Sequence, residues 1–471
     1  MARSWFDRLL TSIADRGRAW AKIPVDLPPL DQALQLTVSL LGGKGEASGA
    51  ALARALIDSY DKLRPEDRLA YFRFLSERFA PDPALLRTAA ERYLAEPSPE
   101  AAMLLAETAE PPRQELLRRI NMGPSGTATL VAMRRDILEL MPQHRELAPL
   151  EVDLKHLFAS WFNRGFLELR RIDWNTPAAI LEKLIVHEAV HEIAGWEDLR
   201  RRLASDRRCF AFFHPALADE PLIFVEVALV HGLACAVQPL LADGVKPVEA
   251  PDTAIFYSIS NCQKGLRGIS FGNFLIKQVV EELKLELPSL TQFSTLSPIP
   301  GFRRWLDRKL AEGAKHLLRS DERTAIVAQA GVKGAKGALK RLLGTKDWIE
   351  DKATAGVLEA PLRRLCAVYL TENREGRGPA DPVARFHLGN GAGLERINWR
   401  ANTAPRGIKE SYGLMVNYLY DLDRIEGQHE AFARQGLVAR SDAVAELLKE
   451  EGGTVKTVGN LLNFTGRRRA T

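Results

Sequence analysis

The sequence predicts an α+β protein, in which an all-α domain over residues 1–157 precedes a mixed-sheet domain over residues 158–471. Two observations support this division. Apolar residues recur at helical spacing through the first third, whereas runs rich in β-branched and aromatic residues alternate with helical segments from about residue 158 onward. The chain of 471 residues is also too long for one ordinary domain, since these usually have roughly 100–200 residues.

The helices of the first third are bounded by prolines and turn residues. Leu69, Phe72 and Leu75 follow Pro65 at helical spacing, which predicts a helix that begins at the proline. We expect this domain to pack against itself or against another subunit. Further helices are predicted at 84–94, 100–107, 113–120 and 127–140.

The second domain mixes both kinds of pattern. A helix is predicted from Asn175 to Trp196, because Asn175, Thr176 and Pro177 form a typical helix start. The basic, Gly-interrupted segment 315–352 is expected to be a surface insertion, and the charged segment 372–382 a mobile loop. Strands are predicted at Arg208–Phe213, Pro221–Val230, Ala254–Ile259 and Tyr412–Tyr420, with a helix at Phe274–Leu285.

Composition excludes several classes of protein. A net charge of +5 is a mild bias over this length, so it argues against a nucleic-acid partner while it suits a small anionic ligand. No run reaches the roughly 18–20 apolar residues that span a bilayer, so no membrane partner is expected. Four cysteines without paired spacing fit a reducing compartment, and the N-terminus lacks a secretory core, which together predict a cytoplasmic location.

One candidate anion-binding turn follows the predicted strand at Ala254–Ile259. Glycines there let the backbone approach a ligand closely, and the free N–H groups at the start of the next helix suit a pyrophosphate. As a motif this is weak, because a glycine-rich loop without a ligand has about the same pattern. The candidate ligand-binding residues are Arg267, Gly268, Ile269, Ser270, Phe271, Gly272 and Asn273.

Two further loops carry groups suited to proton chemistry. Ser297 precedes Pro298, which restricts its backbone to an extended conformation and can aim the hydroxyl. His387 precedes a Gly-Asn-Gly-Ala-Gly run, and imidazole is the usual proton carrier near neutral pH. Each residue also has a plainer interpretation, the serine as a turn cap and the histidine as a packing residue.

Taken together, these stretches resemble the malonyl-CoA decarboxylase family. The strings that carry the resemblance are FYSIS, GLRG-x-x-x-G-x-FLIK, LSPIPGF, FHLGNGA, RINW and GLMVNY, in that order between about Arg207 and Tyr420. Ser270 departs from the pattern, since animal relatives carry Glu there, so no role of that carboxylate is carried over.

The resemblance implies a helical N-terminal domain followed by a GNAT-like catalytic domain. It implies CoA binding by Arg267 through Asn273 and an active pair of Ser297 and His387. The reaction would convert malonyl-CoA to acetyl-CoA and CO2 through a thioester enolate that is protonated at C2. This chemistry requires no organic cofactor or metal, because the thioester carbonyl itself accepts the electrons. Related decarboxylases form oligomers, so a homo-oligomer, either dimer or tetramer, is expected.

Other functions stay open at this point. His187, Glu188 and His191 form an H-E-x-x-H string on the predicted 175–196 helix, which is the pattern of a zinc metallopeptidase. Ala194 and Glu197 stand where one large class of these enzymes has Gly and a third His. An acyltransferase or a non-catalytic acyl-CoA sensor of the same fold is also compatible with the CoA-type turn.

Overall fold

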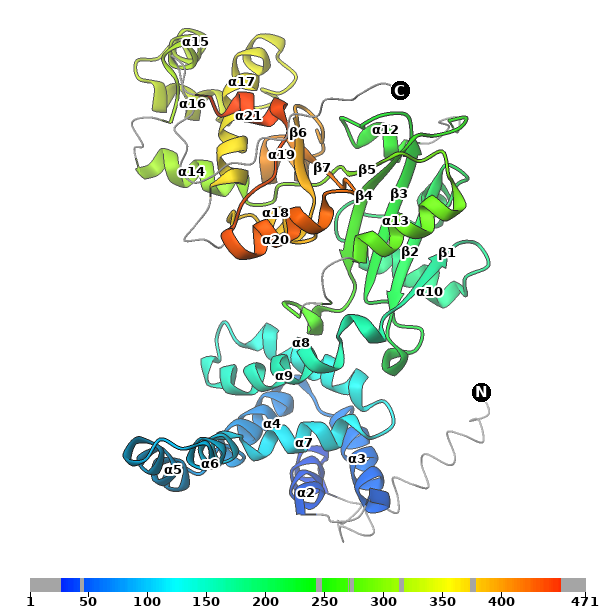
Figure 1. Ribbon diagram of the computed structural model, residues 1–471, viewed down its shortest axis with the longest axis vertical. Helices are drawn as coiled ribbons and strands as arrows, with labels where there is room; N and C mark the ends of the chain where they lie inside the picture. Colours follow the sequence, from blue (N-terminus) through cyan, green and yellow to red (C-terminus); the bar gives the residue numbers. More distant parts are fainter. Residues whose placement is uncertain are drawn as a thin grey trace. The chain divides into compact units, whose positions relative to one another are not determined.

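The computed structural model describes residues 27–42, 46–242, 248–269, 271, 275–312, 317–372 and 378–449 (Figure 1). The chain forms two compact units. The first unit contains the chain up to Glu168, with residues 213–222 and 261–272. The second contains residues 169–212, 223–260 and the chain from residue 273 onward. Within the described ranges, no helix is both long enough and apolar enough to cross a membrane.

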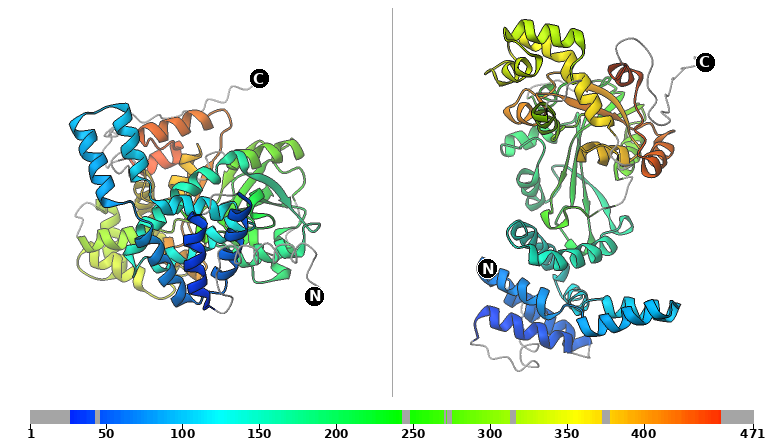
Figure 2. Two further views of the ribbon diagram at one scale, coloured as in Figure 1. Left: turned by 90° about the horizontal axis from the view of Figure 1, so that it is seen from below. Right: turned by 90° about the vertical axis from the view of Figure 1, so that its left-hand side faces the viewer.

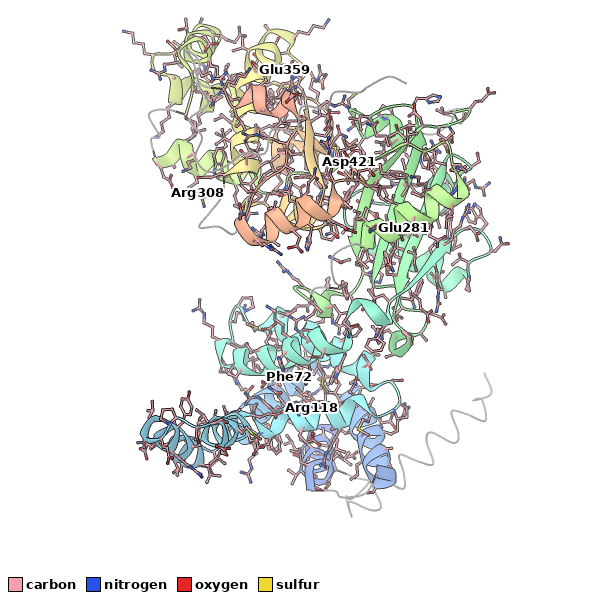
Figure 3. All side chains as sticks on the ribbon, viewed as in Figure 1. Phe72, Arg118, Glu281, Arg308, Glu359 and Asp421 are labelled. Carbon is pink, nitrogen blue, oxygen red and sulfur yellow. The ribbon has the colours of Figure 1, made fainter. Side chains whose placement is uncertain are left out.

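The first unit is built mainly from helices, as predicted. Phe72 is fully buried among them and marks their interior (Figure 3). Pro65 is the first residue of its helix, which confirms the predicted start. The helices are α2 (Pro29–Gly42), α3 (Glu46–Tyr60), α4 (Pro65–Arg78), α5 (Pro83–Ala95), α6 (Pro99–Ala109), α7 (Pro112–Asn121), α8 (Gly126–Leu140) and α9 (Ala148–Trp161).

Helices α5 and α6 pair with each other as a hairpin at one end of this unit (Figure 2). Ala89 and Ala101 are their buried residues, whereas larger apolar side chains face outward. Leu94 and Met103 are 78% and 63% exposed, respectively. The hairpin therefore presents apolar surface that its own helices do not cover.

The second unit is built on a mixed sheet of seven strands in the order β1-β2-β3-β4-β5-β7-β6. Strands β4 and β5 are parallel, whereas β2 with β3, β5 with β7, and β6 with β7 are antiparallel. A helical N-terminal region followed by a mixed-sheet unit confirms the predicted α+β class. The strands are β1 (Glu168–Ile172), β2 (Arg207–Phe213), β3 (Ile223–Val230), β4 (Thr253–Asn261), β5 (Gln292–Thr295), β6 (Gly393–Asn398) and β7 (Met415–Leu419).

Helix α13 (Leu275–Glu286) covers part of this sheet. Five of its apolar residues from Leu275 to Leu283 are buried, whereas Leu285 is exposed and Glu281 lies on its exposed side (Figure 3). Glu286, its last residue, forms an ion pair with Arg208 of β2 at 2.7 Å. The remaining helices are α10 (Ala178–His187), α11 (Trp196–Arg202), α12 (Gln238–Leu241), α14 (Phe302–Glu312), α15 (Ser320–Ala330), α16 (Ala335–Gly344), α17 (Lys352–Thr371), α18 (Pro382–Gly389), α19 (Pro405–Ser411), α20 (Ile425–Gln435) and α21 (Asp442–Leu447).

Three sequence expectations need correction. The helix predicted to reach Trp196 ends at His187, because Glu188 takes an extended backbone conformation with φ −62° and ψ 110°. Segment 315–352 is more than a surface insertion, since α15 and α16 contact each other, α15 contacts α17, and Leu339 is fully buried. In segment 372–382, residues 373–377 lie outside the described ranges, but Asp381 is fully buried, so that end is packed rather than mobile.

Candidate active site

Ser297 lies just beyond the end of β5 and is held against β7. Its backbone N–H donates to the carbonyl of Val416 at 2.8 Å, and its carbonyl accepts from the Val416 N–H at 3.0 Å. Pro298 follows directly and restricts the serine backbone to the extended region. The serine backbone is therefore held by a β-bridge on one side and by a proline on the other. The sequence predicted the restriction by the proline but not the bridge.

His387 lies in the last turn of α18 and meets the serine. Its Nε2 is 3.0 Å from the Ser297 Oγ, and its Nδ1 is 2.8 Å from the hydroxyl of Tyr420. The imidazole also stacks on the ring of Tyr418, with centroids 4.7 Å apart and planes at 24°. The two residues singled out from separate loops of the sequence are thus within hydrogen-bond distance, and both are buried.

The hydrogen bonds around the pair indicate one arrangement of protons. The Ser297 hydroxyl donates to the Thr295 Oγ1 at 2.9 Å, and that oxygen also accepts the backbone N–H of Tyr418 at 3.1 Å. With the serine proton used in this way, a neutral His387 donates its Nε2–H to the Ser297 Oγ. Its Nδ1 then accepts from the Tyr420 hydroxyl. Each of the three hydrogen bonds in the series Tyr420, His387, Ser297 and Thr295 then joins one donor to one acceptor.

Burial determines the protonation states of these hydrogen-bonded side chains. Desolvation lowers the pKa of His387 to about 3, so the imidazole is neutral near pH 7. The same cause raises the pKa of Tyr420 above its ordinary value, so the phenol keeps its proton and can donate. The site without substrate is therefore an uncharged hydroxyl and imidazole relay.

Sequence reasoning missed the residues that support the pair. Thr295, Asn417 and Tyr420 received no role, although Asn417 donates to the Thr295 carbonyl at 2.7 Å and Tyr420 contacts His387. The sequence did contain a pattern that points to Tyr420. Residues 412–420 were identified as a strand, and alternation along a strand puts Tyr418 and Tyr420 on one face. No pattern in the sequence linked that face to His387.

The predicted anion-binding turn lies in the first unit, and part of it is described. Gly268 has φ +76°, a conformation that favours glycine, and the exposed residues here are Arg267 and Gly268. Ile269 and Phe271 are buried, so their side chains pack rather than face a ligand. Ser270, Gly272 and Asn273 lie outside the described residues.

A buried arginine that the sequence did not suggest holds this turn. Arg134 of α8 donates to the carbonyls of Gly265 at 2.6 Å and Arg267 at 3.0 Å, and it pairs with Glu151 of α9 at 2.6 Å. A Cβ at Gly265 would lie 2.0 Å from the Val131 carbonyl oxygen, so only glycine fits. The backbone up to Arg267 is therefore fixed from within the helical unit.

The H-E-x-x-H string does not form the predicted helical metal site. Helix α10 ends at His187, so the two histidines do not lie one turn apart on one helix. The Glu188 carboxylate accepts the backbone N–H groups of Val190 and His191, each at 2.8 Å, and the Ser258 hydroxyl at 2.7 Å. Nor do three or more His, Cys, Asp or Glu side chains gather in a metal-binding arrangement anywhere in the described ranges.

Comparisons with known proteins agree with the resemblance. The family model for the malonyl-CoA decarboxylase C-terminal domain matches residues 165–458, and that for the N-terminal domain matches residues 79–162. The protein named "Malonyl-CoA decarboxylase, mitochondrial" from Anser anser anser is 38% identical over 357 residues, covering 72% of this chain and 70% of the relative. The Rattus norvegicus protein of the same name is 35% identical over 379 residues, covering 76% of each.

Solved structures give the same answer. The crystal structure of malonyl-CoA decarboxylase from Rhodopseudomonas palustris has 50% identity and a TM-score of 0.81, covering 88% of this chain and 99% of that one. The enzyme from Agrobacterium vitis has 48% identity and a TM-score of 0.79, covering 89% and 100%. The similarity therefore extends over nearly the whole of each solved chain.

Proposed function

Because this chain belongs to the malonyl-CoA decarboxylase family, we propose that it converts malonyl-CoA to acetyl-CoA and CO2 at the Ser297 and His387 pair. The observation that carries the proposal is the 3.0 Å contact between the Ser297 Oγ and the His387 Nε2. The reaction requires a hydrogen-bond donor for the developing negative charge and a proton donor for C2, and the pair offers both. No cofactor is required as electron acceptor, because the thioester carbonyl accepts the electrons.

The first step is the loss of CO2. The bond between C2 and the malonyl carboxylate breaks, and its electron pair passes to the thioester oxygen as an enolate. When substrate binds, the Ser297 hydroxyl would turn from the Thr295 Oγ1 and donate instead to the malonyl carboxylate or the thioester oxygen, which would orient the group and stabilise the developing charge. A donor aimed at such an oxygen typically contributes about 3–4 kcal/mol to lowering the barrier.

The second step is protonation of C2, for which His387 is the proposed source. The pKa near 3 describes the imidazole without substrate, when burial alone acts on it. A substrate carboxylate at hydrogen-bond distance favours the imidazolium, because opposite charges attract strongly in a buried site. Binding therefore takes up one proton, which the imidazolium passes to C2, directly or through Ser297. The imidazole returns to its neutral form, and the reaction consumes one proton in total.

The CoA part of the substrate is assigned to the turn recognised in the sequence. In this proposal the guanidinium of Arg267 and the backbone at Gly268 contact the diphosphate. The exposure of both residues and the positive φ of Gly268 support this assignment. The full set proposed to form this turn is Arg267, Gly268, Ile269, Ser270, Phe271, Gly272 and Asn273.

Three further properties are part of the proposal. The reaction is expected to need no cofactor, for the electronic reason given above. A homo-oligomer, dimer or tetramer, is supported by the outward apolar residues of α5 and α6, such as Leu94 and Met103. A cytoplasmic location is proposed from the cysteine usage, although the two relatives described above are named mitochondrial.

The test is product formation by the purified protein. We expect acetyl-CoA and CO2 in equal amounts from malonyl-CoA, with no added cofactor, with a metal chelator present, and with no amine acceptor. An acyltransferase would instead need an acceptor and would transfer the acyl group without releasing CO2. Inhibition by the chelator would contradict the metal-free chemistry, and absence of CO2 would contradict the proposed function as a whole.

A further inference from the structure

Asp381 is a fully buried carboxylate that the reaction scheme does not use. Its Oδ1 accepts the backbone N–H groups of Val383 and Ala384, each at 3.0 Å, and so caps the start of α18. Its Oδ2 accepts the hydroxyl of Tyr369 from α17 at 3.2 Å. His387 lies on the same α18, one helical turn and a half further along.

The same carboxylate also reaches the loop that carries Ser297. The backbone of Gly301, four residues after Ser297, approaches the carboxylate so closely that a Cβ at this position would lie 3.5 Å from the Asp381 Oδ2, and the Gly301 N–H lowers the pKa of that carboxyl. Pro298 and Pro300 restrict the backbone between these points, so the loop has little freedom to adjust. A Cβ at Gly301 would lie 2.1 Å from the Tyr369 hydroxyl, which shows how closely the loop, α17 and the carboxylate approach.

A third element completes this junction. The Tyr369 ring packs against Phe302 and Trp305 of α14, with centroids 5.9 and 5.5 Å apart. The backbone N–H of Trp305 donates to the Gly301 carbonyl at 3.0 Å. Asp381 therefore connects the start of α14, the end of the serine loop, and the start of the histidine helix.

Capping a helix does not require such burial. Asp351 caps α17 from an exposed position, accepting the Thr354 N–H at 3.0 Å. At Asp381, by contrast, burial raises the pKa, and hydrogen bonds from Ala384, Tyr369, Gly301 and Val383 oppose that rise. Burying a carboxylate costs free energy that an exposed cap avoids, and this cost is offset only by such hydrogen bonds, which here reach beyond the helix that is capped.

We propose that Asp381 is a positioning residue that keeps the Ser297 hydroxyl and the His387 imidazole at reacting distance, by joining the Ser297–Gly301 loop to the first turn of α18. The inference rests on the proposed role of that pair. Misplacing reacting groups by about 1 Å can cost roughly 100-fold in rate, so loss of this link should appear in kcat.

The experiment compares Asp381→Asn with the control Asp351→Asn in both wild-type and Ser297→Ala backgrounds. The asparagine oxygen still caps α18, but its Nδ2 faces the Gly301 N–H, so the loop link is lost while the cap remains. We expect Asp381→Asn to lower kcat roughly 10- to 100-fold with KM changed less than about twofold. The same change in the Ser297→Ala background should cost less than about twofold, because without the hydroxyl the distance between residue 297 and His387 no longer matters for the reaction. Asp351→Asn should leave kcat unchanged.

Each result has a defined meaning. Equal losses in the two backgrounds, or a wild-type kcat for Asp381→Asn, would overturn the positioning role. The thermal unfolding midpoint of each variant is measured as well, and kcat is determined well below it, so that a loss of stability is not mistaken for a loss of activity. If Asp381→Asn does not fold, Tyr369→Phe is used instead, because it removes one hydrogen bond to the carboxylate. It should lower kcat roughly threefold in the wild-type background and less in the Ser297→Ala background. Full activity of Ser297→Ala alone would contradict the proposed role of Ser297, whereas absence of CO2 release by the wild-type protein would contradict the proposed function.

Discussion

Two buried histidines in the mixed-sheet unit, His387 and His191, differ in one respect that matters for function. Burial lowers the pKa of His387 to about 3 and that of His191 to about 4, with the Arg202 charge adding to the second shift. His387 has a hydroxyl on each ring nitrogen, whereas the Nε2 of His191 has no partner within the described structure. Burial and a lowered pKa are thus common to both, and only the hydrogen-bond partners distinguish them.

The carboxylates near the two histidines differ in a corresponding way. Glu188, the residue that a zinc peptidase would use as a base, is occupied by two backbone N–H groups and two serine hydroxyls. Its bonds fix the loop that follows α10. Among the described residues, the hydrogen-bond partners of the His387 ring are the hydroxyls of Ser297 and Tyr420, and neither is a carboxylate. The comparison teaches that a short motif can form a purely structural set of hydrogen bonds, as Glu188 does, whereas Ser297 and His387, which no short motif marks, lie within hydrogen-bond distance of each other.

The largest expected effect separates these two histidines. His387→Asn should lower kcat by roughly 100- to 10,000-fold, the usual contribution of a positioned proton carrier. His191→Asn should keep kcat within about threefold of wild type, because no reacting group contacts that ring. Steady-state kinetics with malonyl-CoA measure both, and circular dichroism checks that each variant is folded. A larger loss at His191 than at His387 would reverse the comparison and the assignment of the site.

Substitution of Glu188 should lower the stability of the protein and leave its kcat largely unchanged. Glu188→Ala leaves the hydroxyls of Ser258 and Ser260 without their acceptor and frees two backbone N–H groups of the loop, at a cost of about 2 kcal/mol. Glu188→Gln keeps one acceptor oxygen and should cost less than half as much. Urea unfolding gives these differences. A strong fall in kcat for both variants at unchanged stability would show that Glu188 takes part in the reaction.

The sequence predicted those parts of the fold that depend on local pattern. The helix at Pro65, the strand at 254–259 and the pairing of Ser297 with His387 through the family strings all lie where spacing or long motifs are informative. The strand predicted at 412–420 is shorter, since β7 begins only at Met415, after Tyr412 and Gly413 take positive φ. The end of α10 at His187 could not be predicted, since it depends on Ser258 and Ser260, which are distant in sequence. Asp381 was missed for the same reason, because its partners Tyr369 and Gly301 come from separate segments.

The smallest expected effect concerns the hydroxyl behind the imidazole. Tyr420→Phe removes the donor to the His387 Nδ1 but keeps the ring, so the imidazole loses one of two restraints on its orientation and tautomer. We expect kcat to fall roughly threefold to tenfold with KM unchanged, which corresponds to about 1 kcal/mol for one hydrogen bond. Tyr257→Phe is the matched control, since Tyr257 is an equally buried tyrosine that lies beside Glu226 and His191 and not beside His387. Its kcat should remain within about twofold of wild type. Equal effects of the two substitutions would mean that the Tyr420 hydroxyl serves packing alone, and the relay would then end at His387.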